Sequence, residues 1–174
     1  MSFFRKYLSP VLTLVLICIC VGAILASVNA LTAPVIEANE IRSANETYFA
    51  VLPEADSFTE LQCTVDGVTT VLRADNGSGY VIIAQARGYG GQVPAAVAFD
   101  CNGIITNVIL TSNDETPGLG QKVTAESFYN QFSGKPAEAF TISDIDAVSG
   151  ATISSKAAVN AINLAIKAYW EIMG

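Results

Sequence analysis

The sequence contains no histidine. Without an imidazole, the chain cannot build a Ser-His-Asp or Cys-His hydrolase site or a histidine-ligated metal centre. It also has no glycine fingerprint leading from a strand into a helix, which argues against dinucleotide chemistry. Basic residues are scarce: nine Lys and Arg stand against sixteen Asp and Glu, the net charge is −7, and Arg5 and Lys6 are the one basic cluster. Nucleic-acid binding is therefore disfavoured.

Cysteine is used sparingly, and its four positions do not form a ligand set. Cys18 and Cys20 lie inside a long apolar run, whereas Cys63 and Cys101 lie in the more polar part of the chain. No spacing matches an iron–sulfur or zinc site, so no metal is predicted. Cys63 and Cys101 either form a disulfide outside the cytoplasm or remain free thiols.

A run without charge, residues 10–31, dominates the first part of the chain. As a helix, some twenty apolar residues span about 30 Å, which matches the hydrocarbon core of a membrane. Arg5 and Lys6 precede the run and Glu37 and Glu40 follow it. The positive-inside rule then predicts a cytoplasmic segment 1–9, a transmembrane helix 10–32, and residues 33–174 on the extracytoplasmic side of a bacterial cell membrane.

A cleavable signal peptide is the alternative interpretation of this run. Val28-Asn29-Ala30 satisfies the small-residue cleavage pattern. The run is longer than a usual signal core, however, and isoleucines precede Cys18 and Cys20, so there is no lipobox. These features favour a retained anchor.

The remaining chain predicts a stalk helix, 33–53, and then an α+β domain, 54–174. Pro34 suits a first helical turn and Leu52-Pro53 ends the helix. Alternating apolar residues, separated by turn signals such as Asn76-Gly77, predict an antiparallel sheet built largely from hairpins. The expected strands are Phe58–Thr64, Val68–Ala74, Gly79–Ala86, Val93–Asp100 and Ile104–Thr111.

Helices are expected after a loop-rich segment. Glycines and a proline predict a loop over Asn113–Lys122, followed by a short helix near Ala125–Phe132. A longer helix, near Ser155–Met173, carries an apolar stripe that should pack on the sheet. Its members are Val159, Ile162, Ala165, Ile166 and Tyr169.

The stretch Asp146–Ser155 delivers the Thr152 hydroxyl to the start of this helix through a turn of small residues. The free N–H groups and dipole of a helix N-terminus favour an anion. The local chemistry thus indicates a phosphate held at, or esterified to, Thr152. The alternative is an ordinary Ser/Thr-capped helix start. Since no general base is evident nearby, any modification of Thr152 would be made by another protein.

Two motifs resemble signatures of the FMN-binding domain family. Ser149-Gly150-Ala151-Thr152, preceded by Asp146, resembles its flavinylation motif, and Glu115–Gly120, reading ETPGLG, resembles its second signature. Further similar stretches are Gly88–Gly91, Asp100–Ile104 and Leu31–Pro34. The resemblance covers nearly the whole chain, and it implies FMN joined covalently to Thr152 through a phosphoester bond.

Within that family the chain resembles the G subunits of Rnf electron-transport complexes. The C subunits of sodium-pumping NADH:quinone reductases are similar but usually have a longer exported domain. The resemblance implies that electrons pass through the FMN between neighbouring membrane subunits. The complex would couple ferredoxin:NAD⁺ oxidoreduction to ion translocation, with this chain as an electron carrier. A flavin transferase would attach the FMN.

The site residues follow from these motifs. Gly150 and Ala151 leave room for the phosphate and the flavin ring. Ser149, Ser154 and Ser155 offer hydroxyls to phosphate oxygens or to helix N–H groups. By resemblance, Asp146 serves recognition by the transferase; otherwise it is a turn-forming residue. The ETPGLG loop contributes Glu115 and Thr116 as hydrogen-bond partners of the flavin, or is simply a solvated loop. The cofactor-binding set is completed by Leu119, Gly120 and Lys122, the last as a phosphate neutraliser or a surface residue.

One departure from the family concerns Asn113, where relatives often have histidine. Asparagine hydrogen-bonds but does not titrate, so a proton-handling role is not expected there. Two other functions stay open: a stand-alone exported flavoprotein that reduces an extracellular acceptor, and a non-catalytic, membrane-anchored assembly or binding module.

Overall fold

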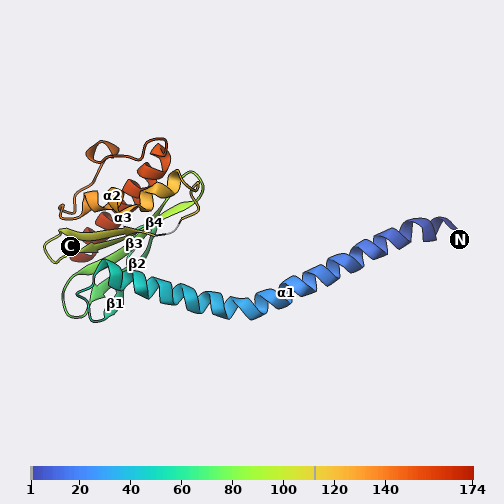
Figure 1. The fold of residues 1–174 in the computed structure, drawn as a ribbon. Helices are drawn as coiled ribbons and strands as arrows, with labels where there is room; N and C mark the ends of the chain where they lie inside the picture. Colours follow the sequence, from blue (N-terminus) through green and yellow to red (C-terminus); the bar gives the residue numbers. More distant parts are fainter. Residues whose placement is uncertain (1, 112) are drawn as a thin grey trace. The chain divides into compact units, whose positions relative to one another are not determined.

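The computed structural model describes residues 2–111 and 113–174 and divides into two units, Met1–Asn45 and Glu46–Gly174. The predicted cytoplasmic segment 1–9 includes residue 1, which lies outside the described residues. Helix α1, Ser2–Val51, begins in the first unit and ends where Leu52-Pro53 predicted (Figure 1). Within it, Val11–Pro34 has a mean hydropathy of 2.9 and is long and apolar enough to cross a membrane.

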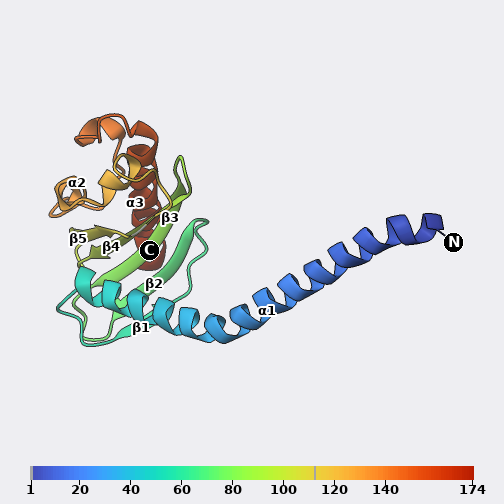
Figure 2. The same ribbon diagram turned by 45° about the vertical axis from the view of Figure 1, so that its right-hand side comes forward.

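The second unit contains a five-stranded antiparallel sheet in which each strand pairs with the next along the chain (Figure 2). Its strands are β1 Phe58–Leu61, β2 Val68–Ala74, β3 Tyr80–Arg87, β4 Gln92–Phe99 and β5 Ile105–Leu110. Apolar β-branched runs separated by tight turns favour this arrangement, because hairpins pair neighbouring segments. The predicted antiparallel sheet of an α+β domain is therefore confirmed, although β1 ends at Leu61, before the expected Thr64.

Short helical turns follow the sheet before the final helix. They are the 3₁₀ helix η1 Gly120–Thr124, helix α2 Glu126–Tyr129, and the 3₁₀ helices η2 Asn130–Phe132 and η3 Ile142–Asp144. The loop predicted to run through Lys122 therefore ends earlier, because its last residues enter η1. The final helix, α3 Thr152–Met173, begins at Thr152 and not at the predicted Ser155.

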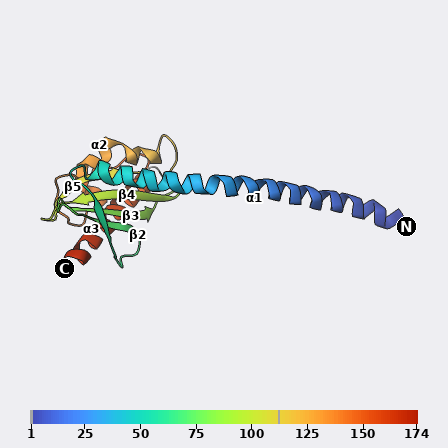
Figure 3. The same ribbon diagram turned by 90° about the horizontal axis from the view of Figure 1, so that it is seen from below.

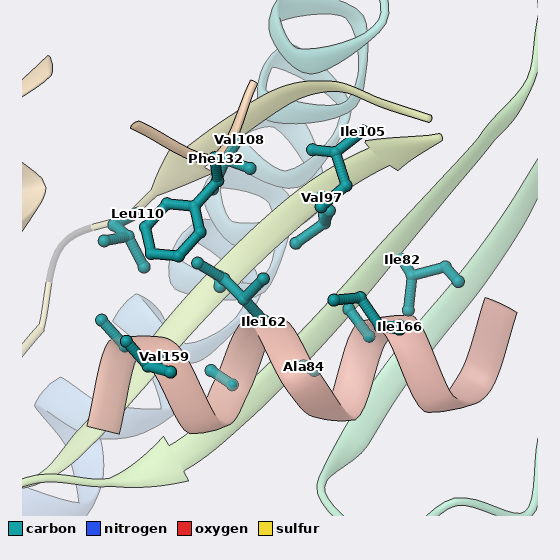
Figure 4. Packing of buried hydrophobic residues seen from close by; sticks show 14 of the residues in the cluster. Ile82, Ala84, Val97, Ile105, Val108, Leu110, Phe132, Val159, Ile162 and Ile166 are labelled. Atoms are coloured by element: carbon teal, nitrogen blue, oxygen red, sulfur yellow. The ribbon is translucent and has the colours of Figure 1, made fainter. Parts of the chain in front are cut away.

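Helix α3 packs along one face of the sheet (Figure 3). Val159, Ile162 and Ile166 point toward strand residues such as Ile82 and Val97 (Figure 4). The predicted apolar stripe is buried throughout. Since side chains alternate along a strand, Val81, Ala96 and Ala98 belong to a second cluster, with Val51 and Leu52, on the other face.

Candidate functional site

A pocket of about 360 Å³ lies between the ETPGLG loop and the start of α3. It therefore brings together two motifs that are well separated in the sequence. A volume of this size falls in the range of about 300–1,000 Å³ that is usual for small-molecule sites. The lining residues are Tyr89, Glu115, Thr116, Leu119, Gly120, Gly150, Ala151, Thr152, Ile153 and Ser154.

The N-terminus of α3 is not capped by a side chain. Its N-cap is Ala151, which makes no side-chain cap hydrogen bond, and the first helical bond runs from Ser155 N–H to the Ala151 carbonyl at 2.9 Å. Within the described chain, the N–H groups of Thr152, Ile153 and Ser154 have no hydrogen-bond acceptor. Such a terminus favours a bound anion, and the ordinary capped start considered from the sequence is not what the structure shows.

Gly150 shapes the turn that leads into this helix start. Its φ of +79° lies in the left-handed region, which a residue with a Cβ adopts only with strain. A Cβ at this position would also lie 3.2 Å from Leu119 Cδ1, across the pocket. Glycine therefore allows both the turn and the close approach of the two loops, and leaves the exposed Thr152 on the pocket wall.

Glu115 is a buried carboxylate that joins three segments of the pocket. It is only 2% exposed. Oε2 accepts a hydrogen bond from the Ser154 hydroxyl at 2.6 Å, and Oε1 accepts one from Gly90 N–H at 3.1 Å. Burial raises the pKa of the carboxyl, but these hydrogen bonds, with those from Tyr89 and Gly91 N–H, lower the pKa below its usual value. The group is therefore a carboxylate at neutral pH.

Glycines make the space that this carboxylate occupies. A Cβ at Gly120 would stand 2.7 Å from Glu115 Oε2 and 2.9 Å from Ser154 Oγ, and a Cβ at Gly88 would collide with Oε1. Real side chains essentially never approach so closely. Contact with Glu115 thus explains why both positions require glycine. These are Gly120, in the ETPGLG loop, and Gly88, in the Gly88–Gly91 turn.

The serine hydroxyls near the start of α3 have partners within the protein or lie outside the pocket lining. Ser154 donates to Glu115, and Ser155 Oγ accepts from Val148 N–H at 3.1 Å. The two serines are buried, and each hydroxyl forms a hydrogen bond within the protein. Ser149 is exposed and does not line the pocket. Lys122, on η1, is also exposed and away from the lining.

The backbone of Asp146 is held in place while its side chain is exposed. Gln131 Oε1 accepts from Asp146 N–H at 2.6 Å, and Gln131 Nε2 donates to the Asp146 carbonyl at 3.3 Å. The residue is therefore accessible from solvent. No sequence signal at Gln131 points to this pairing.

Asn113 shapes the ETPGLG loop from its beginning. Its Oδ1 accepts a hydrogen bond from Glu115 N–H at 3.1 Å, and its carbonyl accepts one from Gln121 Nε2 at 3.3 Å. Its Nδ2 has no partner among residues 2–111 and 113–174. Asn113 thus supports the loop that contains Glu115.

Tyr89 is a lining residue that the sequence did not predict. It is 72% exposed and lies on the turn between β3 and β4. The sequence Gly88-Tyr89-Gly90-Gly91 resembles a family stretch, but nothing local assigns its tyrosine to the cofactor site. Ile153, which is 54% exposed, is a second apolar residue at the pocket that was not predicted.

Within the described residues there is no cluster of His, Cys, Asp and Glu able to hold a metal ion. Cys63 and Cys101 are free thiols: Cys63 Sγ lies 3.8 Å from Glu171 Oε1, and Cys101 Sγ lies 3.3 Å from the Gly77 carbonyl. The disulfide alternative is thus not realised in this structure.

An uncapped helix start, a threonine beside it and an apolar-edged pocket define a domain suited to a phosphate-bearing cofactor. The family model that matches the chain, over residues 88–167, is described as an FMN-binding domain. This range includes the pocket residues from Tyr89 to Ser154.

Relatives extend the match over most of the chain. It is 32% identical to the G subunit of the proton-translocating ferredoxin:NAD(+) oxidoreductase complex of Clostridium ljungdahlii, covering 88% of this chain and 86% of the relative. It is 27% identical to the G subunit of the Na(+)-translocating ferredoxin:NAD(+) oxidoreductase complex of Acetobacterium woodii, covering 85% and 84%. The chain belongs to the family of G subunits of these ion-translocating oxidoreductase complexes.

A solved structure supports the fold. The C subunit of the Na(+)-translocating NADH-quinone reductase from Parabacteroides distasonis superposes with a TM-score of 0.50, at 22% identity, over 61% of each chain. The likeness is one of architecture, the antiparallel sheet with its helices.

Proposed function

We propose that this chain is an electron-relay subunit that carries FMN esterified to Thr152, within a membrane complex coupling ferredoxin:NAD⁺ oxidoreduction to ion translocation. One observation carries the proposal: the exposed Thr152 stands on the pocket wall at the uncapped start of α3. The family match to an FMN-binding domain supports the choice of cofactor. The names of the relatives support the choice of complex.

The residues present fit FMN by their chemistry. The free N–H groups at the start of α3 suit a phosphate, while Leu119, Ile153 and Tyr89 offer apolar surface to a planar ring. Bound FMN would supply reversible uptake and release of electrons, whereas the protein binds it, orients it and limits its contact with water. The chain alone is then an electron carrier, and the complex is the enzyme.

Under this proposal, the chain does not determine which ion the complex translocates. The relatives' names specify protons in one case and sodium in another, although they are similarly related to this sequence. An ion pathway through this chain is also not indicated by the described span Val11–Pro34, which contains no charged residue. The proposed relay function leaves ion specificity to neighbouring subunits.

The proposed topology has the N-terminus in the cytoplasm and the FMN domain on the extracytoplasmic side. Arg5 and Lys6 before the span support this orientation. A flavin transferase on the same side as the domain would meet the exposed Asp146 and Thr152. Attachment by an ester would prevent loss of the cofactor outside the cell.

The function can be tested with a pair of threonine variants expressed in a host that has the transferase. Thr152→Ala removes the ester oxygen and should abolish flavin fluorescence of the denatured protein in a gel. Thr152→Ser keeps a hydroxyl and should retain part of the signal. Fluorescence that persists in Thr152→Ala would contradict attachment at this residue.

Purification of the native protein separates this function from its alternatives. The relay function predicts that the chain copurifies with several polytopic membrane subunits. A flavinylated chain purified alone would favour a stand-alone exported flavoprotein. A fully processed chain without flavin would favour an anchored binding module.

A further inference from the structure

The tyrosine at the pocket is exposed to an unusual degree for an aromatic residue. Tyr89, at 72%, is the most exposed large hydrophobic residue among those described in the unit Glu46–Gly174. It nevertheless lines the same pocket as Thr152. An aromatic side chain at the wall of a concave site typically packs against a bound ring, since it offers a large, rigid surface at little cost in conformational entropy.

Two hydrogen bonds hold the turn that bears Tyr89. Gly88 N–H donates to the Gly91 carbonyl at 2.8 Å, which closes the turn on itself. Gly90 N–H donates to Glu115 Oε1 at 3.1 Å, which ties the turn to the ETPGLG loop. The other oxygen of the same carboxylate holds Ser154, in the first turn of α3, at 2.6 Å.

We propose that Glu115 is a positioning residue, which links the Gly88–Gly91 turn to the start of α3 and so holds the Tyr89 ring against the flavin carried by Thr152. This proposal rests on the proposed attachment of FMN at Thr152. It differs from a role for Glu115 as a hydrogen-bond partner of the flavin, because each of its oxygens already accepts a hydrogen bond from the protein.

The arrangement suits this task physically. Hydrogen bonds to a carboxylate are shorter and stronger than neutral ones, and burial at 2% exposure removes competition from water. Because Gly88 and Gly120 have no Cβ, the Glu115 carboxylate fits between the Gly88–Gly91 turn and the ETPGLG loop. The turn also packs against Asp114, but the bond from Gly90 N–H to Glu115 connects it to the start of α3 through Ser154.

The test uses the full chain, flavinylated in its host and purified in detergent, with time-resolved flavin fluorescence as the readout. A phenol in contact with a flavin ring shortens its fluorescence lifetime strongly, whereas a phenyl ring does so far less. The first step is the peptide mass of Thr152. Absence of FMN there would refute the proposed function itself, before the ring environment is measured.

On flavinylated protein, Tyr89→Phe should lengthen the lifetime severalfold while iodide, a water-borne quencher, gains no additional access. Tyr89→Ala should lengthen the lifetime and also admit iodide. Tyr129→Phe, a half-buried tyrosine outside the pocket lining, serves as the control and should change neither quantity. An unchanged lifetime in Tyr89→Phe would overturn the ring contact.

Glu115→Gln tests the positioning role, because Tyr89 is still present. The amide replaces one acceptor by a donor, so the turn should loosen and the lifetime should lengthen and become heterogeneous. Should this variant fail to fold, Ser154→Ala keeps the carboxylate and removes only the link to α3, and a partial lengthening is expected. A lifetime equal to that of the unaltered protein in whichever variant folds would refute the positioning role.

Discussion

The position of Thr152 depends on a single residue with no side chain. Gly150 has a φ of +79° and its α-carbon faces Leu119 Cδ1, which a Cβ would approach to 3.2 Å. Backbone conformation and limited space therefore both explain the glycine of the SGAT motif. The threonine hydroxyl depends on that turn for its place on the pocket wall.

Gly150→Ala should lower stability and slow flavin attachment together. The left-handed conformation costs a residue with a Cβ about 1–2 kcal/mol, and the added methyl presses on Leu119. The free energy of unfolding from denaturant titration measures the first effect, and the rate of flavin incorporation by a transferase measures the second.

Gly134→Ala is the matched control for that substitution. Gly134 has a similar φ of +78°, and a Cβ there would meet nothing within 4 Å. It should lose comparable stability and retain the normal rate of flavin attachment. Equal rates in the two variants would show that Gly150 matters for folding alone.

At the scale of elements, the pocket exists because three segments meet at one carboxylate. The β3–β4 turn, the ETPGLG loop and the first turn of α3 are each hydrogen-bonded to Glu115, or include it. None of these segments could form the pocket wall independently, since each is short or lies at the end of an element. The site is thus a product of tertiary contacts.

Glu115→Gln should destabilise the protein in a pH-dependent way. The folded-state pKa lies below the unfolded one, so the carboxylate contributes stability at pH values above about 4.3, the ordinary value for glutamate. This contribution is lost as the pH falls through the folded-state pKa. At neutral pH the substitution should cost about 1–3 kcal/mol, the range for leaving buried hydrogen-bonding groups unpaired.

Urea titrations of the two proteins from neutral to acidic pH measure this difference. The gap in unfolding free energy should be greatest at neutral pH and should shrink on acidification below about pH 4. A difference in unfolding free energy that stays constant with pH would mean that the charge of Glu115 does not contribute to stability. The substitution would then act through the shape of the side chain.

Local patterns of the sequence predict the elements better than they predict the site's internal contacts. Alternation and turn residues are local, and they correctly indicate the five strands and the buried face of α3. The partners of Glu115 lie 25 and 39 residues away, at Gly90 and Ser154. No periodicity encodes such contacts, which is why the burial of Glu115 and the lining role of Tyr89 were not predicted.

The start of α3 is a second place where the sequence does not predict which contacts the side chains make. Serine hydroxyls near a helix N-terminus usually indicate caps or anion ligands. Ser154 and Ser155 instead turn inward to Glu115 and to Val148 N–H. The sequence shows that hydroxyls are present, but only the fold determines which way they face.

At the scale of the whole molecule, the chain combines a membrane-compatible helix with a folded cofactor domain. Val11–Pro34 is long and apolar enough to span a membrane, and the unit Glu46–Gly174 contains the pocket. This division suits a relay protein, because the anchor keeps the cofactor beside neighbouring subunits in the membrane. Under the proposed relay function no soluble substrate is required, so the pocket would hold only its own cofactor.

Cys101 provides a native probe of the proposed topology. Cys101 is exposed. In a variant that keeps Cys101 as its single cysteine, a membrane-impermeant maleimide should therefore label the thiol in spheroplasts. The control is Ser2→Cys in a chain without other cysteines, which should be labelled only after the membrane is permeabilised. The opposite pattern would place the domain in the cytoplasm.

Covalent attachment of FMN is tested most directly by the mass of the Thr152 peptide from protein purified out of native membranes. Phosphoester-linked FMN should increase this mass by one FMN less one water, and fragmentation should locate the increase at Thr152. An unmodified Thr152 in cells that contain an active flavin transferase would contradict the covalent relay.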